Sequence, residues 1–256
     1  MARWQTSTMA MDERPMTQAT SFGAVAVAYE RGRPTYPSRA IDWLLPSDAS
    51  RVVDIGAGTG KLTRQLRDRD LDVVAVEPLS EMREQLACAV PDVTVLAGTA
   101  EDIPLDDGSV DLVVVAQAWH WVVPAQAVPE AARVLSPGGR LGLLWNIRDE
   151  REDWVARLGR ILGDIGGSAT EHVNPPVGSP FGPVADLEVE WTHHLTPSAL
   201  IDLVSSRSHV ITLPEDERTA VLGEVRQLLE THAALAGVTE IALPYITQCF
   251  RATLAT

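Results

Sequence analysis

Residues 51–61 read RVVDIGAGTGK. The first five form a short apolar run, which predicts a buried strand, and the glycines that follow predict a tight turn into a helix. Glycine lets the backbone bend sharply and approach a ligand closely. Open α/β sheets bind ligands at the carboxyl ends of their strands. The stretch therefore predicts a ligand-binding loop, containing Gly56, Gly58 and Gly60, directly after the first strand of an α/β sheet.

Apolar runs and helical segments alternate along the rest of the chain. The first five runs lack alternation of polar and apolar residues, as expected for parallel strands that helices cover on both faces. The expected strands span 51–55, 72–77, 93–97, 110–116, 140–147, 185–195 and 239–253, and the expected helices span 40–45, 59–69, 80–90, 124–135, 153–165, 197–206 and 215–236. Ser38 is the predicted cap of the first helix, and residues 136–139 are a predicted turn. We predict a doubly wound α/β fold.

Composition and charge exclude several classes of protein. The chain has 256 residues, 45% of them hydrophobic and 22% charged, with a formal net charge of −14. Such a chain is ordinary for a globular protein, but its charge disfavours nucleic acids and anionic membranes as partners. A local arginine cluster could still bind a small anion. No set of Cys, His and carboxylate residues has the spacing of a zinc site, so we expect no metal.

The N-terminal residues, the lengths of the apolar runs and the cysteines indicate the cellular compartment. Residues 1–20 are polar and rich in methionine, and we expect a disordered tail rather than a secretory signal. No apolar run reaches the roughly 18 residues that cross a bilayer. Cys88 and Cys249 form no disulfide framework. We expect a cytoplasmic protein, monomeric or homodimeric, with neither nucleic acid nor membrane as a partner.

The glycine spacing distinguishes two classes of nucleotide-binding fold. A dinucleotide fold has the pattern G-x-G-x-x-G, whereas here the third glycine comes one residue early and Lys61 takes its place. Asp54 would be poorly placed beside a pyrophosphate, but it can order the loop or meet a cationic amino group. Glu77 ends the second strand, where a carboxylate can accept both hydroxyls of a ribose. An NAD-dependent oxidoreductase is disfavoured, although it remains an alternative.

Five segments resemble, in order and spacing, the motifs of class I S-adenosylmethionine-dependent methyltransferases. They are residues 52–61, 77–82, 98–105, 111–117 and 135–141. The family implies S-adenosylmethionine as cofactor and a Rossmann-like, seven-stranded, mostly parallel sheet with an antiparallel last strand. Residues 21–256 would then be a single domain, with a cofactor half at about 29–147. Residues of about 150–236 would supply a small helical cap over the active site, which selects the substrate.

The resemblance also implies roles for individual residues. The loop residues would face the methionine part of the cofactor: Asp54, Gly56, Ala57, Gly58 and Gly60. Glu77, followed by Pro78, would hold the ribose, and Gln117 would lie beside the methyl-bearing sulfur. The residues implied at the adenine edge are Thr99, Ala100 and Glu101.

Two further segments, 22–37 and 116–121, resemble those of type-11 methyltransferases related to trans-aconitate methyltransferase. By this resemblance Tyr29 and Arg33 would close over the cofactor near its carboxylate, and the alternative is an ordinary amphipathic segment. Ala116 to Trp121 would follow the fourth strand at the active site.

The acceptor decides which side chains the chemistry needs. A carboxylate acceptor needs no base at neutral pH, whereas a hydroxyl or an amine can require one. His120 is the candidate base, because imidazole titrates near neutral pH; the alternative is a packed histidine that orients the loop or binds a substrate oxygen. Trp119 and Trp121 are either an apolar wall for the acceptor or core, and Asn146 is expected to face the cleft.

We predict methyl transfer to a small molecule, as O-methylation of a carboxylate or a hydroxyl on an apolar skeleton. One alternative is a non-catalytic protein that binds S-adenosylmethionine or its product S-adenosylhomocysteine. A nucleic-acid methyltransferase is disfavoured by the charge and because no Asn-Pro-Pro-Tyr or Asp-Pro-Pro-Tyr motif follows the fourth strand.

Overall fold

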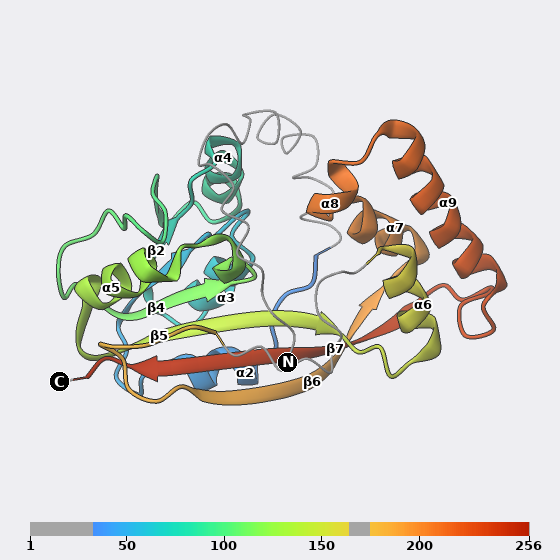
Figure 1. The fold of residues 1–256 in the computed structure, drawn as a ribbon. Helices are drawn as coiled ribbons and strands as arrows, with labels where there is room; N and C mark the ends of the chain where they lie inside the picture. The colour runs from blue at the N-terminus through green and yellow to red at the C-terminus, as the bar shows by residue number, and fades with distance from the viewer. Residues whose placement is uncertain (1–32, 164–174, 256) are drawn as a thin grey trace.

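The computed structural model describes residues 33–163 and 175–255, so the tail expected at 1–20 lies outside the described residues. The described chain forms one seven-stranded sheet in the order β3-β2-β1-β4-β5-β7-β6 (Figure 1). The strands are β1 (Arg51–Ile55), β2 (Asp72–Val76), β3 (Thr94–Leu96), β4 (Val110–Ala116), β5 (Leu135–Arg148), β6 (Ala185–Leu195) and β7 (Ile241–Thr253). The helices, with one 3-10 turn η1, are α2 (Ser38–Leu44), α3 (Lys61–Arg67), α4 (Ser80–Ala89), η1 (Trp119–Trp121), α5 (Pro124–Val134), α6 (Asp153–Ile161), α7 (Pro197–Ser205), α8 (Ser208–Ile211) and α9 (Glu215–Thr231).

The parallel strands bring the predicted motifs to one edge of the sheet. β1 pairs in parallel with β2 and β4, with Ile55 opposite Val76 on one side and Val115 on the other. Because all three strands end together, the segments that follow them lie side by side. The glycine loop, Glu77 and Gln117 therefore share the carboxyl edge.

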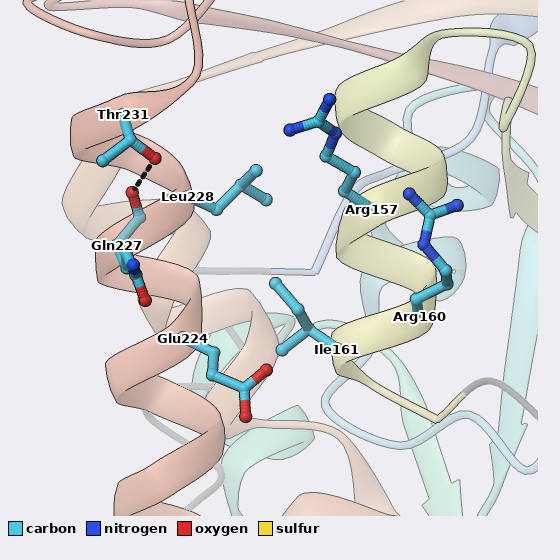
Figure 2. A pocket seen from close by; sticks show the side chains of 7 residues that line it. All are labelled: Arg157, Arg160, Ile161, Glu224, Gln227, Leu228 and Thr231. Carbon is cyan, nitrogen blue, oxygen red and sulfur yellow. Dashed lines mark hydrogen bonds between the residues drawn. The ribbon is translucent and has the colours of Figure 1, made fainter.

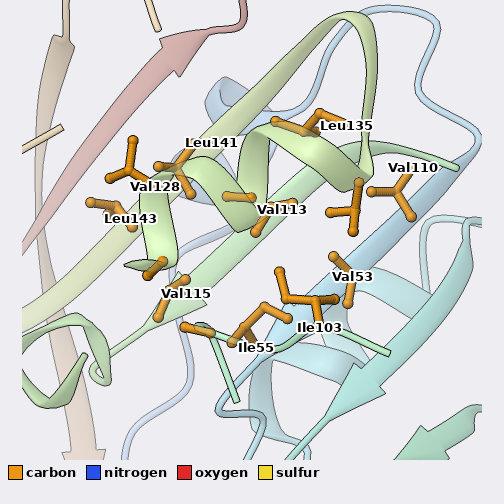
Figure 3. Packing of buried hydrophobic residues seen from close by; sticks show 14 of the residues in the cluster. Val53, Ile55, Ile103, Val110, Val113, Val115, Val128, Leu135, Leu141 and Leu143 are labelled. Carbon is orange, nitrogen blue, oxygen red and sulfur yellow. The ribbon is translucent and has the colours of Figure 1, made fainter. Parts of the chain in front are cut away.

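Successive side chains of the parallel strands point to opposite faces of the sheet, and both faces are buried in apolar layers. Val53 and Val113 belong to one apolar cluster with Val128 of α5 on one face of the sheet (Figure 3). Val52 and Leu112 pack with α2, α3 and α4 on the other face. The period of two is that of a strand, and burial on both faces explains why the sequence shows apolar runs. This confirms the predicted doubly wound α/β architecture.

The last strand is antiparallel, as predicted. β7 pairs with β5 from Thr253 opposite Arg140 to Tyr245 opposite Arg148, and with β6 on its other side. The antiparallel β7 is thus inserted between two strands that run the other way.

A cap of four helices stands at one end of the long strands β5, β6 and β7 (Figure 1). The helix α6 lies between β5 and β6 in the chain, and α7, α8 and α9 lie between β6 and β7. Their apolar side chains form a separate cluster, which also takes in Leu195, Ile241 and Tyr245 from the ends of β6 and β7. The predicted helical cap is present, with α8 as an unpredicted addition.

Several boundaries differ from the sequence expectations. Ser38 does not cap α2, because Pro37 occupies the N-cap in an extended conformation and accepts the N–H of Ala40 through its carbonyl. The helix expected from residue 59 begins at Lys61, since Gly60 has a positive φ of 86°. The turn expected at 136–139 is part of β5, which contains an irregular register between the pairs Val110–Leu135 and Leu112–Arg140.

Within the described residues, no helix combines the length and the apolar character needed to cross a membrane.

Candidate active site

The glycine loop is fixed to the neighbouring strand by backbone hydrogen bonds. Gly56, Gly58 and Gly60 have φ values of 66°, 56° and 86°, which favour glycine over other residues. The N–H groups of Gly56 and Ala57 donate to the carbonyl of Val76 at 2.8 and 3.2 Å. A Cβ on Gly56 would lie 2.9 Å from that of Ala118. The loop is therefore held tightly between β2 and the segment after β4.

Open space remains on one side of this loop. A Cβ built on Gly58 meets no atom within 4 Å, in contrast to one built on Gly60, which would lie 2.9 Å from Leu86. Gly58 thus combines a conformation that excludes side chains with a free approach to its Cα, as a ligand-binding loop requires.

Asp54 points into the protein. Its side chain is 1% exposed and accepts a hydrogen bond of 2.6 Å from the hydroxyl of Thr63 in α3. Burial, reinforced by the charge of Glu77, raises the pKa of Asp54 to about 7 although the Thr63 hydrogen bond lowers it. Of the two roles left open by the sequence, this geometry serves the ordering of the loop.

Glu77 is the carboxylate that touches the loop. Its two oxygens accept the N–H groups of Gly58 and Leu79 at 2.9 and 3.0 Å. Burial raises the pKa of Glu77, and these hydrogen bonds oppose that rise. Arg83 donates to the carbonyls of Glu77 and Pro78, which fixes the turn into α4.

The segment after β3 is tied to the segment after β4. Ala100 is buried, and the Thr99 hydroxyl accepts the N–H of Glu101 at 3.2 Å. The Glu101 carboxylate accepts the N–H of Val123 at 2.7 Å. Glu101 therefore joins the two segments, and its predicted contact with adenine remains a prediction.

Gln117 occupies an unusual backbone conformation. Its φ is +58°, and residues other than glycine rarely adopt this left-handed region, which costs about 1 kcal/mol or more. The Gln117 N–H donates to the carbonyl of Leu144 at 2.9 Å, and its side-chain amide donates to the carbonyl of Asn146 at 3.1 Å. The strained residue is thus held against the end of β5.

The 3-10 turn η1 separates its two tryptophans. Trp119 packs in the apolar layer beneath the sheet edge, and its Nε1 has no hydrogen-bond partner among the described residues. Trp121 is 67% exposed and lies against His120, with 4.8 Å between the ring centroids. Burial lowers the pKa of His120. Trp119 therefore has the position of a core residue, whereas Trp121 and His120 reach the surface beside the carboxyl edge.

Asn146 uses its side chain within the protein. Its Oδ1 accepts the hydroxyl of Thr247 at 2.6 Å, and its Nδ2 donates to the carbonyl of Thr35 at 2.9 Å. The same Thr247 hydroxyl accepts the indole N–H of Trp191 at 2.8 Å. This chain of bonds, which the sequence did not reveal, fastens the leading segment (residues 33–37) to β5 and β7.

Arg33 lies at the junction between the leading segment and the cap. Its Nη2 donates to the carbonyl of Ser206 at 3.4 Å, directly after α7. The other predicted residue of this segment, Tyr29, lies outside the described residues. Tyr36 exchanges two hydrogen bonds with Gln65 of α3, so the leading segment spans from the cap to the first helix after the glycine loop.

A surface pocket lies elsewhere, between α6 and α9 of the cap (Figure 2). Its polar lining includes Arg157, Arg160 and Glu224, and Figure 2 shows no predicted site residue in it. Among the described residues, no group of three or more His, Cys, Asp or Glu could hold a metal ion. The predicted residues of the glycine loop, with Glu77 and Gln117, instead follow the carboxyl ends of β1, β2 and β4.

Comparison with known proteins identifies the family. A family model described as a methyltransferase domain, type 11, matches residues 53–143. An uncharacterised methyltransferase of Mycobacterium tuberculosis is 61% identical over 235 residues, which cover 92% of this chain and 96% of the relative. An uncharacterised methyltransferase-like protein of Schizosaccharomyces pombe is 35% identical and covers 90% of this chain and 94% of its own length.

Solved structures agree on the fold. A protein of Anaeromyxobacter dehalogenans, provisionally described as a type II methyltransferase, has a TM-score of 0.66 and 25% identity, covering 87% of this chain and 98% of its own. A phosphoethanolamine N-methyltransferase of Haemonchus contortus, solved with S-adenosylmethionine, has a TM-score of 0.52 at 14% identity, covering 95% of this chain and 59% of its own. None of these proteins is described as a trans-aconitate methyltransferase, so that subgroup stays a prediction. The chain itself is a methyltransferase and belongs to the class I, type-11 family.

Proposed function

We propose that this methyltransferase uses S-adenosylmethionine and methylates a small molecule on a carboxylate or a hydroxyl. The observation that carries the choice of cofactor is the occupation of the loop N–H groups. Those of Gly56 and Ala57 donate to Val76, and that of Gly58 donates to the Glu77 carboxylate at 2.9 Å. A dinucleotide fold offers such N–H groups to a pyrophosphate. The occupied loop is therefore poorly suited to NAD.

The residues at the loop fit the parts of S-adenosylmethionine. Each oxygen of Glu77 accepts one backbone N–H and keeps lone-pair capacity, which two ribose hydroxyls can use. Glu77 is a buried carboxylate at the loop, and a ligand that carries a sulfonium and an ammonium group suits a site with an acidic side chain. When bound, the cofactor supplies a methyl group that is already activated. The protein then has to orient the acceptor and exclude water.

We also propose that the two parts of the chain share this work within one domain, residues 21–256. The part at about 29–147 would hold the cofactor, and the cap at about 150–236 would select the acceptor. The cap packs its apolar cluster against the ends of β6 and β7, beside the carboxyl edge. The cytoplasmic location, the small-molecule acceptor and the monomeric or homodimeric state stay predictions.

The cofactor proposal is tested by calorimetric titration with S-adenosylhomocysteine, and with NADH in parallel. We expect binding of S-adenosylhomocysteine alone. Glu77→Gln should weaken it about tenfold or more, because a neutral amide is a weaker acceptor than a carboxylate. Glu81→Gln is the matched control, since Glu81 is on the first turn of α4 with its charge in solvent. Binding of NADH alone, or equal losses in both variants, would contradict the proposal.

His120 discriminates between the two acceptor chemistries. Because burial lowers its pKa, the imidazole is neutral at pH 7 and can accept a proton. With a hydroxyl acceptor, His120→Gln should lower kcat by about 100-fold or more, the size of a general-base contribution. With a carboxylate acceptor the loss should stay small. The readout is methyl incorporation into candidate acceptors from pH 5 to 8, because a base whose pKa is lowered predicts a rate that rises with pH in the acidic part of this range, in the native protein alone.

The same assay distinguishes an enzyme from a non-catalytic protein that only binds the cofactor. A protein that binds S-adenosylhomocysteine but transfers no methyl group to any carboxylate or hydroxyl acceptor across a broad panel would be a sensor or scaffold. Methyl incorporation into one acceptor, with saturation kinetics, excludes that alternative.

A further inference from the structure

The strand order changes direction between β1 and β4. From β1 the chain continues outward to β2 and β3, whereas β4 is followed by β5 on the other side. Open α/β sheets bind ligands at such a switch point, outside the carboxyl ends of the strands. The glycine loop follows β1 and Gln117 follows β4, and a Cβ on Gly56 would lie 2.9 Å from that of Ala118. The two segments therefore meet at the switch point.

The leading segment (residues 33–37) is bonded on both sides of this switch point. On the β4 side, the carbonyl of Thr35 accepts the side-chain amide of Asn146 at 2.9 Å, and Asn146 lies in β5 beyond the end of β4. On the β1 side, the backbone of Tyr36 exchanges two hydrogen bonds with the side chain of Gln65 in α3, the helix after the glycine loop. The leading segment therefore bridges the two halves of the sheet where a ligand is expected.

Asn146 holds both the leading segment and Gln117. Its backbone carbonyl accepts the side-chain amide of Gln117 at 3.1 Å, while its own side chain donates to Thr35. Gln117 has a φ of +58°, a conformation that persists only where the surrounding structure fixes it. Asn146 thus connects a strained residue after β4 to the segment that bridges the switch point.

Trp191 of β6 sets the direction of the hydrogen bonds around Asn146. An indole N–H can only donate, so the Thr247 hydroxyl accepts it at 2.8 Å and gives its single proton to Asn146 at 2.6 Å. The atom of Asn146 that faces Thr247 is therefore its oxygen, which turns its nitrogen toward the carbonyl of Thr35. Trp191 is itself stacked on Tyr245, with 5.4 Å between the ring centroids.

We propose that Asn146, Thr247 and Trp191 are positioning residues for ligand binding at the switch point. Thr247 and Trp191 orient the amide of Asn146, and Asn146 holds the leading segment against the site. This inference rests on the proposed function. It changes the role predicted for Asn146 from binding the acceptor to positioning the protein around the cofactor.

The experiment is calorimetric titration of the full chain with S-adenosylhomocysteine, without any acceptor. Asn146→Ala should weaken binding about tenfold and Thr247→Val about threefold or more, because each removes hydrogen bonds that hold the leading segment. Thr247→Ser keeps the hydroxyl, so it should stay within about twofold of the native protein. The double variant with Thr247→Val and Asn146→Ala should lose no more than Asn146→Ala alone, because Thr247 acts through Asn146.

Val225→Ala in the cap helix α9 is the control for a general loss of stability. Val225 is fully buried, so the substitution leaves a cavity and destabilises the protein, but it should not change the affinity. The proposal is overturned if Asn146→Ala binds like the native protein, if Thr247→Ser is as weak as Thr247→Val, if the losses add in the double variant, or if Val225→Ala weakens binding equally. Where Thr247→Val fails to fold, Trp191→Phe, which removes the indole donor and keeps an aromatic ring, carries the test.

Hydrogen exchange separates this inference from the proposed function. Failure of S-adenosylhomocysteine to bind the native protein would refute the proposed function. The backbone amides of Thr35 and Tyr36 can still be followed in the ligand-free proteins, and they should exchange faster in Thr247→Val than in Thr247→Ser. Equal exchange in these two variants would refute the positioning role.

Discussion

The two parts of this protein are built by different rules. At the carboxyl edge of β1, β2 and β4, short backbone hydrogen bonds hold the functional groups, and each group lies within a few residues of a strand end. At the base of the cap, Arg148 of β5 lies opposite Tyr245 of β7, and Arg33 of the leading segment donates to the carbonyl of Ser206 after α7, so each contact joins segments far apart in the sequence. The first arrangement is local and repeatable, whereas the second depends on the tertiary fold. The predicted cofactor residues are therefore readable as motifs in the sequence, whereas the contacts at the base of the cap are not.

Among the substitutions that test this difference between the two regions, the largest effect is expected from one in the glycine loop. Gly56→Ala places a Cβ 2.9 Å from Ala118 at a φ of 66°. We expect the free energy of unfolding to fall by about 2–4 kcal/mol, from backbone strain and the steric clash together. Affinity for S-adenosylhomocysteine should fall more than about tenfold, since a displaced loop also displaces the Glu77 carboxylate, which accepts the Gly58 N–H.

Gly237→Ala is the control for that variant in the other part of the chain. Gly237 has a similar φ of 76°, but a Cβ there meets nothing within 4 Å. Gly237→Ala should lower the free energy of unfolding by about 1 kcal/mol, the cost of backbone strain alone, and should leave the affinity for S-adenosylhomocysteine unchanged. Urea unfolding and calorimetry measure both quantities, and equal losses in the two variants would remove the distinction between the regions.

A smaller effect is expected where the two regions are joined. Thr247 is fully buried, and its hydroxyl connects Trp191 to Asn146. Thr247→Val removes that hydroxyl without changing the shape, which leaves both partners unsatisfied and costs about 1–3 kcal/mol. Because Asn146 also holds Thr35, the leading segment should become more accessible to protease. Thr253→Val at the exposed end of the same strand is the control, and similar proteolysis of the two variants would contradict a joining role.

The smallest expected effect is an increase in the free energy of unfolding. The pKa of Asp54 is raised from 3.8 to about 7, so the folded state binds a proton more tightly than the unfolded state. The contribution of this group to stability is thus present at low pH and is lost as pH rises from about 4 to about 7. Asp54→Asn should remove that loss and make the protein more stable at pH 8, by about 1 kcal/mol after relaxation of the site. Melting temperatures at pH 4.5 and 8 check this, and a variant less stable at pH 8 would show that the charged carboxylate is stabilising.

The sequence predicted the sheet better than it predicted the contacts. All seven strands were predicted, and the apolar runs were clearest for β1, β2 and β4, which are buried on both faces of the sheet. The short helix α8 was missed, since four residues are too few to show a helical period. Ser38 was expected to cap α2 from its chemistry alone, and the fixed backbone of Pro37 took that position instead.

The predicted residues that follow β1, β2 and β4 lie at one edge of the sheet, but the sequence could not tell which way their side chains point. Nothing in the sequence indicates that Asn146 spends its amide on Thr35 and Thr247, or that Glu101 bonds to Val123. These bonds depend on the crossing of distant segments. The cluster of Arg148 and Tyr245 is hidden for the same reason, because only the antiparallel register of β5 and β7 brings them opposite each other.

The strand β7 has a mechanical consequence for how an acceptor enters. Its first residues, Ile241 and Leu243, are packed in the cap, while Phe250 and Ala252 are packed beneath the sheet. The continuous strand β7 thus connects the cap to the sheet without a loop between them. A rigid-body rotation of the cap away from the sheet would bend β7 and disrupt its pairing with β5 and β6. Entry of small molecules is therefore expected to occur without a rigid-body movement of the cap.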